Sequence, residues 1–208
     1  DWNSLSQSGV VAGYGIEWVA FANKPPRRFA IAFVQPGSPA AVAGLTRGDE
    51  IATADGVDFV NGSDTTTLNN ALFPATLGEK HSFVFHNAAN TLSKTVSLTS
   101  ASITITPVPI ATVITQASGR KVGYLQFTDH IATAEAQLIT AINNFKTAKI
   151  DDLVLDMRYN GGGYLFIASE LAYMIAGSTA TSGKWFERLQ YNDKRTSDNA
   201  ASPTPYYN

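Results

Sequence analysis

The sequence predicts an α+β protein with two parts, a β-rich module with two short helices followed by an α/β layer. In the first part, Phe29, Ile31 and Phe33 alternate with small residues, which is the period of a half-buried strand. In the second part, a strand, a helix, a strand, a glycine loop and another helix follow one another. That order is typical of a parallel α/β pair.

A change in composition separates the two parts. The residues around 100–116 are rich in Thr, Ile, Val and Pro, and Pro107 and Pro109 favour an extended chain because proline restricts the residue before it. The predicted segments are an N-terminal remnant (1–8), the β-rich module (9–100), an extended connector (101–118) and the α/β layer (119–208). Two clear strands make an incomplete sheet, so we expect more of the parent protein downstream.

Local signals place the elements of the β-rich module. Residues 83–85 and 94–98 read as strands joined by a turn at 87–90. Residues 38–45 predict a short helix that Pro39 begins and Gly44 ends, since proline suits a first helical turn and glycine the residue after the last. Residues 65–72 predict a second helix.

The α/β layer begins with a strand at 122–128. Thr133 is a candidate cap for a helix whose apolar residues share one face: Ala134, Leu138, Ala141, Ile142 and Phe145. A short apolar strand follows at 153–155. A second helix is expected from about Leu165 to Ile175, ending at Gly177. Beyond Gly183 the pattern weakens to that of a polar loop.

Composition and charge exclude several classes of protein. The formal net charge of −2 gives no strong field for a nucleic-acid backbone, so no nucleic acid is expected as a partner. Cysteine is absent, which excludes thiol nucleophiles and cysteine-based metal sites. No apolar run approaches the ~20 residues of a membrane helix. Only 15% of the residues are charged, which favours an exported protein.

The sharpest local feature is Asn160 followed by Gly161, Gly162 and Gly163, where a buried strand meets a helix. Such a junction presents free backbone N–H groups to an oxyanion or another anion. A tight turn that needs glycine only for its backbone angles is the simpler alternative. No Lys-Ser/Thr follows the loop, so nucleotide binding does not fit. Asp156 and Arg158 are expected to hold the loop by an ion pair.

The titratable side chains give no recognisable catalytic set. His81, His86 and His130 do not have the spacing of metal ligands, and we expect neither a metal nor a cofactor. His130 could serve as a base, but no serine stands in a recognisable nucleophile setting. Other serines, such as Ser169, read as helix and loop residues.

A second glycine-rich feature lies near the start of the chain, at Gly13, Tyr14, Gly15 and Ile16. Together with Leu68 and Leu72, which share one helix face, it could form a groove whose amides bind the terminal carboxylate of a peptide. An ordinary glycine turn and a core helix are the alternative.

Taken together, these features resemble a known family. Residues 34–56 are similar to the segment that marks PDZ domains of bacterial proteases. Residues 121–127 and 153–163 resemble the core of the C-terminal-processing, or tail-specific, serine peptidases. The order of these segments covers nearly the whole chain.

The resemblance implies a PDZ domain that holds substrate C-termini and a partial ClpP/crotonase-like domain that cuts nearby. A backbone N–H within Gly161 to Gly163 would form one arm of the oxyanion hole, and Gly13 to Ile16 match the carboxylate-binding loop. The family's Ser–Lys dyad has no counterpart here and is expected beyond Asn208, so the fragment should bind peptides without cutting them. The alternative is a non-catalytic peptide-binding or scaffold protein of the same fold.

Overall fold

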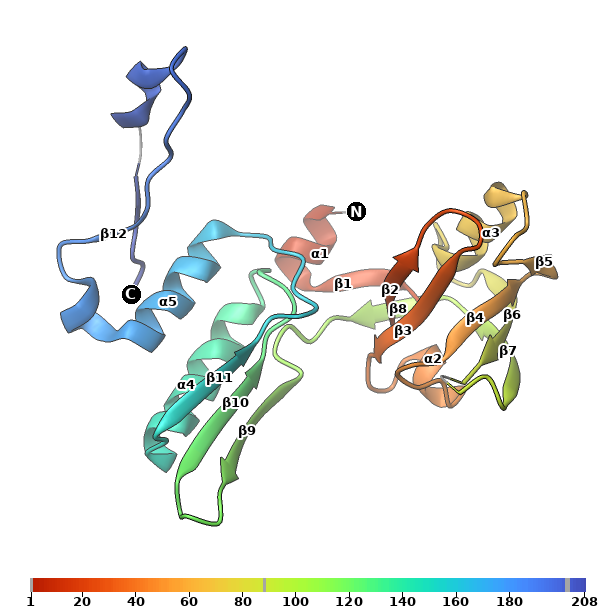
Figure 1. The fold of residues 1–208 in the computed structure, drawn as a ribbon, viewed down its shortest axis with the longest axis horizontal. Helices are drawn as coiled ribbons and strands as arrows, with labels where there is room; N and C mark the ends of the chain where they lie inside the picture. The colour runs from red at the N-terminus through yellow and green to blue at the C-terminus, as the bar shows by residue number, and fades with distance from the viewer. Residues whose placement is uncertain (1, 88, 201–202) are drawn as a thin grey trace. The chain divides into compact units, whose positions relative to one another are not determined.

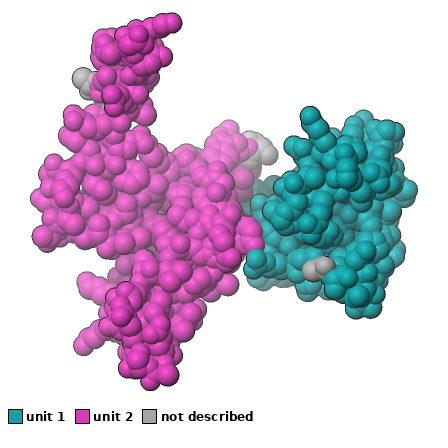
Figure 2. Space-filling view, in the orientation of Figure 1, with its two compact units in different colours: residues 1, 10–105 teal, residues 2–9, 106–208 magenta. Residues whose placement is uncertain are grey.

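The computed structural model describes residues 2–87, 89–200 and 203–208, which form two compact units (Figures 1 and 2). The first unit comprises Val10–Ile105, and the second comprises Trp2–Gly9 together with Thr106–Asn208.

A six-stranded antiparallel sheet forms the body of the first unit. The strands pair in the order β2-β3-β4-β6-β7, with β5 added against β4, so β2 lies at one end of this order. Their bounds are β2 Ile16–Ala22, β3 Arg28–Val34, β4 Glu50–Ala54, β5 Val57–Asp58, β6 Lys80–His86 and β7 Ser93–Thr99. Two further strands, β1 (Val10–Gly13) and β8 (Ala101–Thr104), pair with each other.

Both short helices of the first unit begin at side-chain caps. Helix α2 (Pro39–Val42) begins after Ser38, whose hydroxyl accepts from the backbone N–H of Ala41 at 3.3 Å. Helix α3 (Thr65–Leu72) begins after Asp64, whose carboxylate accepts from the N–H of Thr67 at 3.0 Å. Such caps satisfy N–H groups that the helix itself leaves unpaired.

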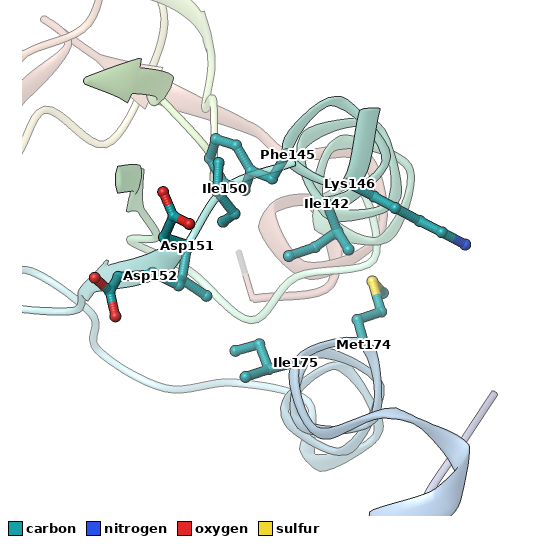
Figure 3. A pocket seen from close by; sticks show the side chains of 9 residues that line it. Ile142, Phe145, Lys146, Ile150, Asp151, Asp152, Met174 and Ile175 are labelled. Carbon is teal, nitrogen blue, oxygen red and sulfur yellow. The ribbon is translucent and has the colours of Figure 1, made fainter. Parts of the chain in front are cut away.

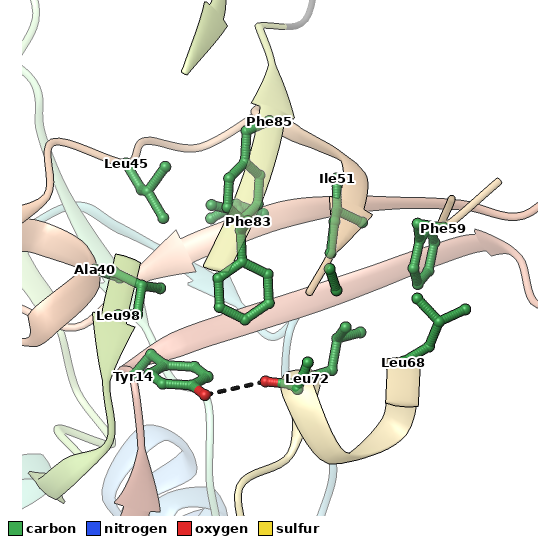
Figure 4. Packing of buried hydrophobic residues seen from close by; sticks show 13 residues of the cluster. Tyr14, Ala40, Leu45, Ile51, Phe59, Leu68, Leu72, Phe83, Phe85 and Leu98 are labelled. Carbon is green, nitrogen blue, oxygen red and sulfur yellow. Dashed lines mark hydrogen bonds between the residues drawn. The ribbon is translucent and has the colours of Figure 1, made fainter. Parts of the chain in front are cut away.

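The core of the first unit lies between the sheet and α3 (Figure 4). Phe83 and Phe85 of β6 are fully buried and point to the same side of the strand because they are two residues apart. The predicted alternation in β3 is only partly present. Ala30, Ile31 and Ala32 are all buried, whereas Phe33 is half-buried, so burial does not follow a period of two along this strand.

The second unit contains a three-stranded sheet in the order β11-β10-β9. Strands β10 (Lys121–Gln126) and β11 (Asp152–Asp156) are parallel, as the sequence predicted, and β9 (Ile110–Thr115) is antiparallel to β10. Helices α4 (Ala134–Ala148) and α5 (Leu165–Thr181) pack with this sheet around one apolar cluster.

The apolar face predicted for α4 is confirmed. Ala134, Leu138, Ala141 and Phe145 are buried, and Ile142 packs against the same cluster. The capping role of Thr133 is wrong. Its backbone is already helical, its side chain makes no capping hydrogen bond, and its buried hydroxyl has no partner among the described residues.

The segments at the boundaries differ most from expectation. The proline-containing stretch 101–118 is extended, but it is not a free connector, because β8 pairs within the first unit and β9 within the second. The N-terminal residues form a helix, α1 (Trp2–Ser8), that belongs to the second unit. Extended pairing and helix packing over long sequence distances leave no local signal in these residues.

The C-terminal part also has more structure than a loop. Helix α5 continues past Gly177, where the backbone is locally non-helical, to Thr181. Strands β12 (Trp185–Glu187) and β13 (Thr204–Pro205) pair with each other, and a 3₁₀ helix, η1, covers Thr196–Ala200. Among the described residues, no helix is both long enough and apolar enough to span a bilayer.

One charged cluster in the first unit makes its stability depend on pH. The His81 Nδ1 atom lies 2.6 Å from Asp55 Oδ2, and its Nε2 atom lies 3.5 Å from Glu79. The hydrogen bond to Asp55 raises the pKa of His81 above its ordinary value. A raised pKa means that this stabilisation is complete below the unfolded-state pKa and is lost as the pH rises through the folded-state pKa.

We therefore expect His81→Gln to lower the free energy of unfolding by up to about 1 kcal/mol at pH 6 and by less at pH 8.5. Denaturant unfolding of the chain at the two pH values measures this difference. His86→Gln is the matched control, because the His86 ring nitrogen meets the hydroxyl of Ser93 and not a carboxylate. An equal loss at both pH values for His81→Gln would contradict the assignment.

Candidate functional site

The glycine loop of the second unit lies in the open between β11 and α5. Gly161, Gly162 and Gly163 are exposed, and α5 begins two residues later at Leu165. The backbone φ angles of Gly162 and Gly163 are +93° and +135°, a region that residues with a side chain rarely adopt. The loop therefore joins β11 to α5 through backbone conformations that glycine adopts readily and other residues rarely adopt.

The loop is held to the segment after β10 by two backbone hydrogen bonds. The N–H of His130 donates to the carbonyl of Gly162 at 2.9 Å, and the N–H of Tyr164 donates to the carbonyl of His130 at 2.7 Å. Gly163 lies between these bonds, and a Cβ atom there would overlap the His130 carbonyl oxygen. The tight-turn interpretation of these glycines is therefore right for Gly163, without excluding an oxyanion role.

Asn160 fixes the loop from the inside. Its Oδ1 atom accepts from the N–H of Gly162 at 2.8 Å and lies 2.9 Å from His130 Nδ1, while its Nδ2 donates to the carbonyl of Phe127 at 3.1 Å. Because an amide oxygen only accepts, the Nδ1 atom of His130 carries the proton. Burial lowers the pKa of His130, so the ring is neutral at pH 7.

These bonds decide which glycine amides remain available. The N–H of Gly162 is already used by Asn160. The N–H groups of Gly161 and Gly163 meet no acceptor in the described part of the chain. Two exposed amides beside the start of α5 therefore remain free to bind an anionic oxygen.

The end of β11 is fixed by charge. Asp156 accepts from Tyr124 Oη at 2.6 Å and from Arg158 Nη2 at 2.6 Å, which confirms the predicted ion pair. Arg158 holds the pKa of Asp156 well below its usual range, and Tyr124 contributes in the same direction. This carboxylate is therefore a permanently ionised support for the loop and not a proton-transferring group.

Helix α1 supports the other side of the loop, which the sequence did not indicate. Tyr164 Oη donates to Ser6 Oγ at 3.0 Å and accepts from Gln7 Nε2 at 2.6 Å. The N–H of Ala132 donates to the carbonyl of Ser6 at 2.8 Å. The N-terminal helix thus fixes the residue that directly follows Gly163.

Ser169, which the sequence indicated to be a helix residue, and His130, which could serve as a base, both make structural contacts. Ser169 is fully buried, donates to the carbonyl of Pro205 at 2.7 Å and accepts from the N–H of Tyr207. His130 faces Asn160, and Phe127 packs edge-on against its ring. No serine–base pair forms among the described residues around the glycine loop.

A hollow of about 330 Å³ beside β11 is a separate feature (Figure 3). Ile142 of α4 and Met174 of α5 point toward each other across it, and Lys146 points away. The two carboxylates at its rim are occupied, since Asp151 accepts from the N–H of Lys121 and Asp152 pairs with Arg120. Its apolar walls and paired charges suit packing and not catalysis.

In the first unit, the loop from Gly13 to Ile16 leads from β1 into β2. The side chain of Tyr14 is 3% exposed, and its hydroxyl donates to the carbonyl of Ala71 at 3.1 Å, so only its backbone could contact a ligand. Gly15 has a φ of +76°, and a Cβ atom there would overlap Ser38. Glycine is therefore required at residue 15, whereas a Cβ at Gly13 meets open space.

Leu68 and Leu72 of α3 line a pocket, whereas Gly13 to Ile16 are not among its lining residues. Both side chains are at least 95% buried, so they act mainly as core residues. A pocket of about 350 Å³ opens beside them. It is lined by Asn23, Arg27, Phe29, Phe59, Thr65, Leu68, Asn69, Leu72 and Phe73.

Comparison with known proteins finds a family match within the second unit. Residues 121–206 match the family model described as Peptidase family S41. The chain carries an S41 peptidase segment. The glycine loop lies within it.

Relatives of the S41 segment and the preceding unit are processing proteases. The chain is 29% identical over 169 residues to a carboxyl-terminal-processing protease of Picosynechococcus, covering 81% of this chain and 39% of that protein. It is 26% identical to the chloroplastic C-terminal processing peptidase of Tetradesmus obliquus, again covering 81% of this chain and 38% of that protein. The chain thus spans about two fifths of the length of these curated relatives.

Solved structures agree in fold. A Bacteroides fragilis protein assigned to the S41 proteases superposes with a TM-score of 0.57 at 25% identity, covering 94% of this chain and 52% of that one. The photosystem II D1 C-terminal processing protease superposes with a TM-score of 0.54 at 27% identity, covering 78% and 43%. The mixed α/β architecture is therefore that of S41 proteases.

The glycines of the loop should differ in their tolerance to substitution. We expect Gly163→Ala to lower the free energy of unfolding by about 1–3 kcal/mol or more, because a strained backbone and a clash with His130 combine. Gly162→Ala should show the backbone strain alone, since a Cβ there meets no atom within 4 Å. Gly161→Ala is the control, with ordinary φ and open space, and should stay within about 0.5 kcal/mol of wild type. Denaturant unfolding measures the series, and equal losses at residues 161 and 163 would contradict it.

Proposed function

We propose that this chain is the substrate-capturing and oxyanion-binding portion of a serine endopeptidase of the C-terminal-processing type. In this proposal, the first unit is a PDZ domain that holds the C-terminal segment of a polypeptide. The S41 segment provides part of the cutting site, and a Ser–Lys dyad outside this chain supplies the nucleophile and base. An exported, periplasmic or envelope location fits the low charge content and is part of the same proposal.

The observation that carries the proposal is the pair of unengaged amides at Gly161 and Gly163 inside the S41 segment. In acyl transfer, a backbone N–H directed at the developing oxyanion stabilises the transition state by about 2.7–4 kcal/mol. Asn160 and the His130 carbonyl fix the backbone around these amides before any substrate arrives. Donors that need no reorganisation during the reaction are the most effective kind.

The first unit supports capture of an extended peptide. Strand β2 lies at the end of its sheet order, so one side of its backbone can pair with an added strand. The loop from Gly13 to Ile16 directly precedes β2, where its amides can bind a terminal carboxylate. Helix α3 and the pocket beside Leu68 provide the opposite wall of the groove.

Capture by the carboxylate loop predicts a dependence on the free C-terminus. A peptide that ends in an apolar residue should bind about tenfold more tightly than the same peptide with an amidated C-terminus, since charged hydrogen bonds contribute about 1.5–3 kcal/mol. Fluorescence anisotropy of N-terminally labelled peptides with the chain measures both affinities. Equal binding of the two peptides would count against this loop as the carboxylate site.

A nucleophile outside the chain predicts that this fragment is chemically inert. A fluorophosphonate probe should label none of its serines, because no described serine of the S41 segment, which holds the free glycine amides, hydrogen-bonds to a histidine or lysine side chain. A longer form of the protein that includes a Ser–Lys dyad should be labelled at that serine, as peptide mapping by mass spectrometry would show. Labelling within residues 1–208 would overturn the assignment. A longer form that binds peptides but is never labelled would instead indicate the scaffold alternative.

A further inference from the structure

The pocket beside α3 contains a cation that its structural contacts do not neutralise. Arg27 lies at the end of the β2–β3 hairpin and lines the pocket together with Asn23, Phe29 and Asn69. Its Nη1 atom donates to the carbonyls of Phe59 at 3.1 Å and Gly62 at 2.8 Å. These two bonds hold the guanidinium in place and leave its Nε and Nη2 atoms without a partner among the described residues.

The sequence around Arg27 is free of acidic residues, although Glu50 and Asp58 line a second hollow that Arg27 also borders. No Asp or Glu occurs between residues 18 and 48, whereas Lys24, Arg27, Arg28 and Arg47 all lie in that stretch. Arg28 is paired with Glu50 by a bidentate contact, but Arg27 has no carboxylate within 4 Å in the described part of the chain. A half-buried guanidinium that is fixed and unpaired is suited to a planar anion such as a carboxylate.

The remaining walls of the pocket define the shape of the ligand. Phe29, Leu68 and Phe73 provide apolar surface, and the Phe73 side chain is 59% exposed. Thr65 and Asn69 add polar groups from α3. A side chain with an aliphatic stem and a terminal carboxylate matches these walls, with its stem along the rings and its charge at Arg27.

Arg27 lies at the end of the pocket away from the carboxylate loop, because it contacts the Phe59 carbonyl, while the pocket itself continues along α3 to Leu72 and Phe73. Figure 4 shows Tyr14 beside the Leu72 end of α3 and Phe59 beside the Leu68 end. Strand β2 runs from Ile16, next to Tyr14, to Ala22, one residue before Asn23 of the pocket. The six steps between the seven residues of β2, at about 3.4 Å each, cover roughly 20 Å, so a peptide antiparallel to β2 would reach Arg27 several residues before its C-terminus.

We propose that the Arg27 pocket is a specificity subsite that selects an acidic side chain, preferably Glu, about four to six residues before the C-terminal carboxylate of the bound peptide. The proposal rests on the proposed function of the first unit as a C-terminus-binding domain. It adds a substrate requirement, a distal acidic residue, to the requirement for a free C-terminus.

A glutamate scan of the ligand tests the subsite without changing the protein. One neutral, extended peptide with a free apolar C-terminus is synthesised with a single Glu at each position from two to eight residues before its end, and with Gln at the same positions. We expect a maximum in the Glu-over-Gln preference four to six residues before the C-terminus, of roughly three- to tenfold in Kd. The preference should shrink as NaCl is raised. A flat scan would overturn the proposal.

Variants then assign the preference to Arg27. Arg27→Gln should abolish the preference for Glu while the Gln peptides keep their affinity, and Arg27→Lys should retain only part of it because the planar fork is lost. Lys24→Gln is the matched control, since it removes a cation from the same hairpin outside the pocket and should leave the scan unchanged. If the preference for Glu over Gln persists in Arg27→Gln, or disappears in Lys24→Gln, the assignment to Arg27 is contradicted.

The result separates this inference from the proposed function. If no peptide binds, or amidated peptides bind equally well, the carboxylate-loop function itself fails. If free C-termini bind but Glu and Gln are equivalent at every position, only the Arg27 subsite fails. Circular dichroism of Arg27→Gln shows whether loss of the two carbonyl contacts has unfolded the hairpin, and the wild-type scan decides the question even if it has.

Discussion

The close approach of the His130 carbonyl to Gly163 is the constraint on which the S41 segment depends. Two hydrogen bonds join the segment after β10 to the loop after β11, and they leave no room for a side chain at residue 163. The parallel pairing of β10 and β11 brings these segments together, since the carboxyl ends of parallel strands lie at the same edge. The loop amides are thereby held by the sheet itself and not by the loop sequence alone.

Three sets of contacts hold the glycine loop in place. Asn160 fixes the loop from within, the Asp156–Arg158 pair fixes the end of β11, and α1 fixes Tyr164 through Ser6 and Gln7. Only the Asn160 contact engages a glycine directly, at the N–H of Gly162, and the other two act on residues that flank the loop. This arrangement leaves the N–H groups of Gly161 and Gly163 without an acceptor among the described residues. Free N–H groups suit an anion-binding site, and a simple turn would not need them.

In the first unit, most of the side chains that shape the groove beside α3 are buried and cannot contact a ligand. Buried side chains such as Tyr14, Leu68 and Leu72 pack beneath the groove. The surface that a ligand could meet consists of backbone and of more exposed side chains such as Arg27, Asn69 and Phe73. Sequence reasoning selected the buried residues because periodicity reports which face of a helix is apolar. It does not report whether that face is core or binding surface, since both need the same residue types.

The sequence by itself determined the elements with local causes. The helix at 65–72, the apolar face of α4, the parallel strand pair and the Asp156–Arg158 ion pair all follow from periodicity, capping or residues two positions apart. Only the tertiary structure decided the role of α1 and the pairing of β8 and β9. It also decided that, among the described residues, the hydroxyl of Thr133 has no partner and Arg27 has no carboxylate partner. These features depend on contacts between residues far apart in the chain. A sequence does not reveal them because burial and long-range hydrogen-bond partners exist only after the chain has folded.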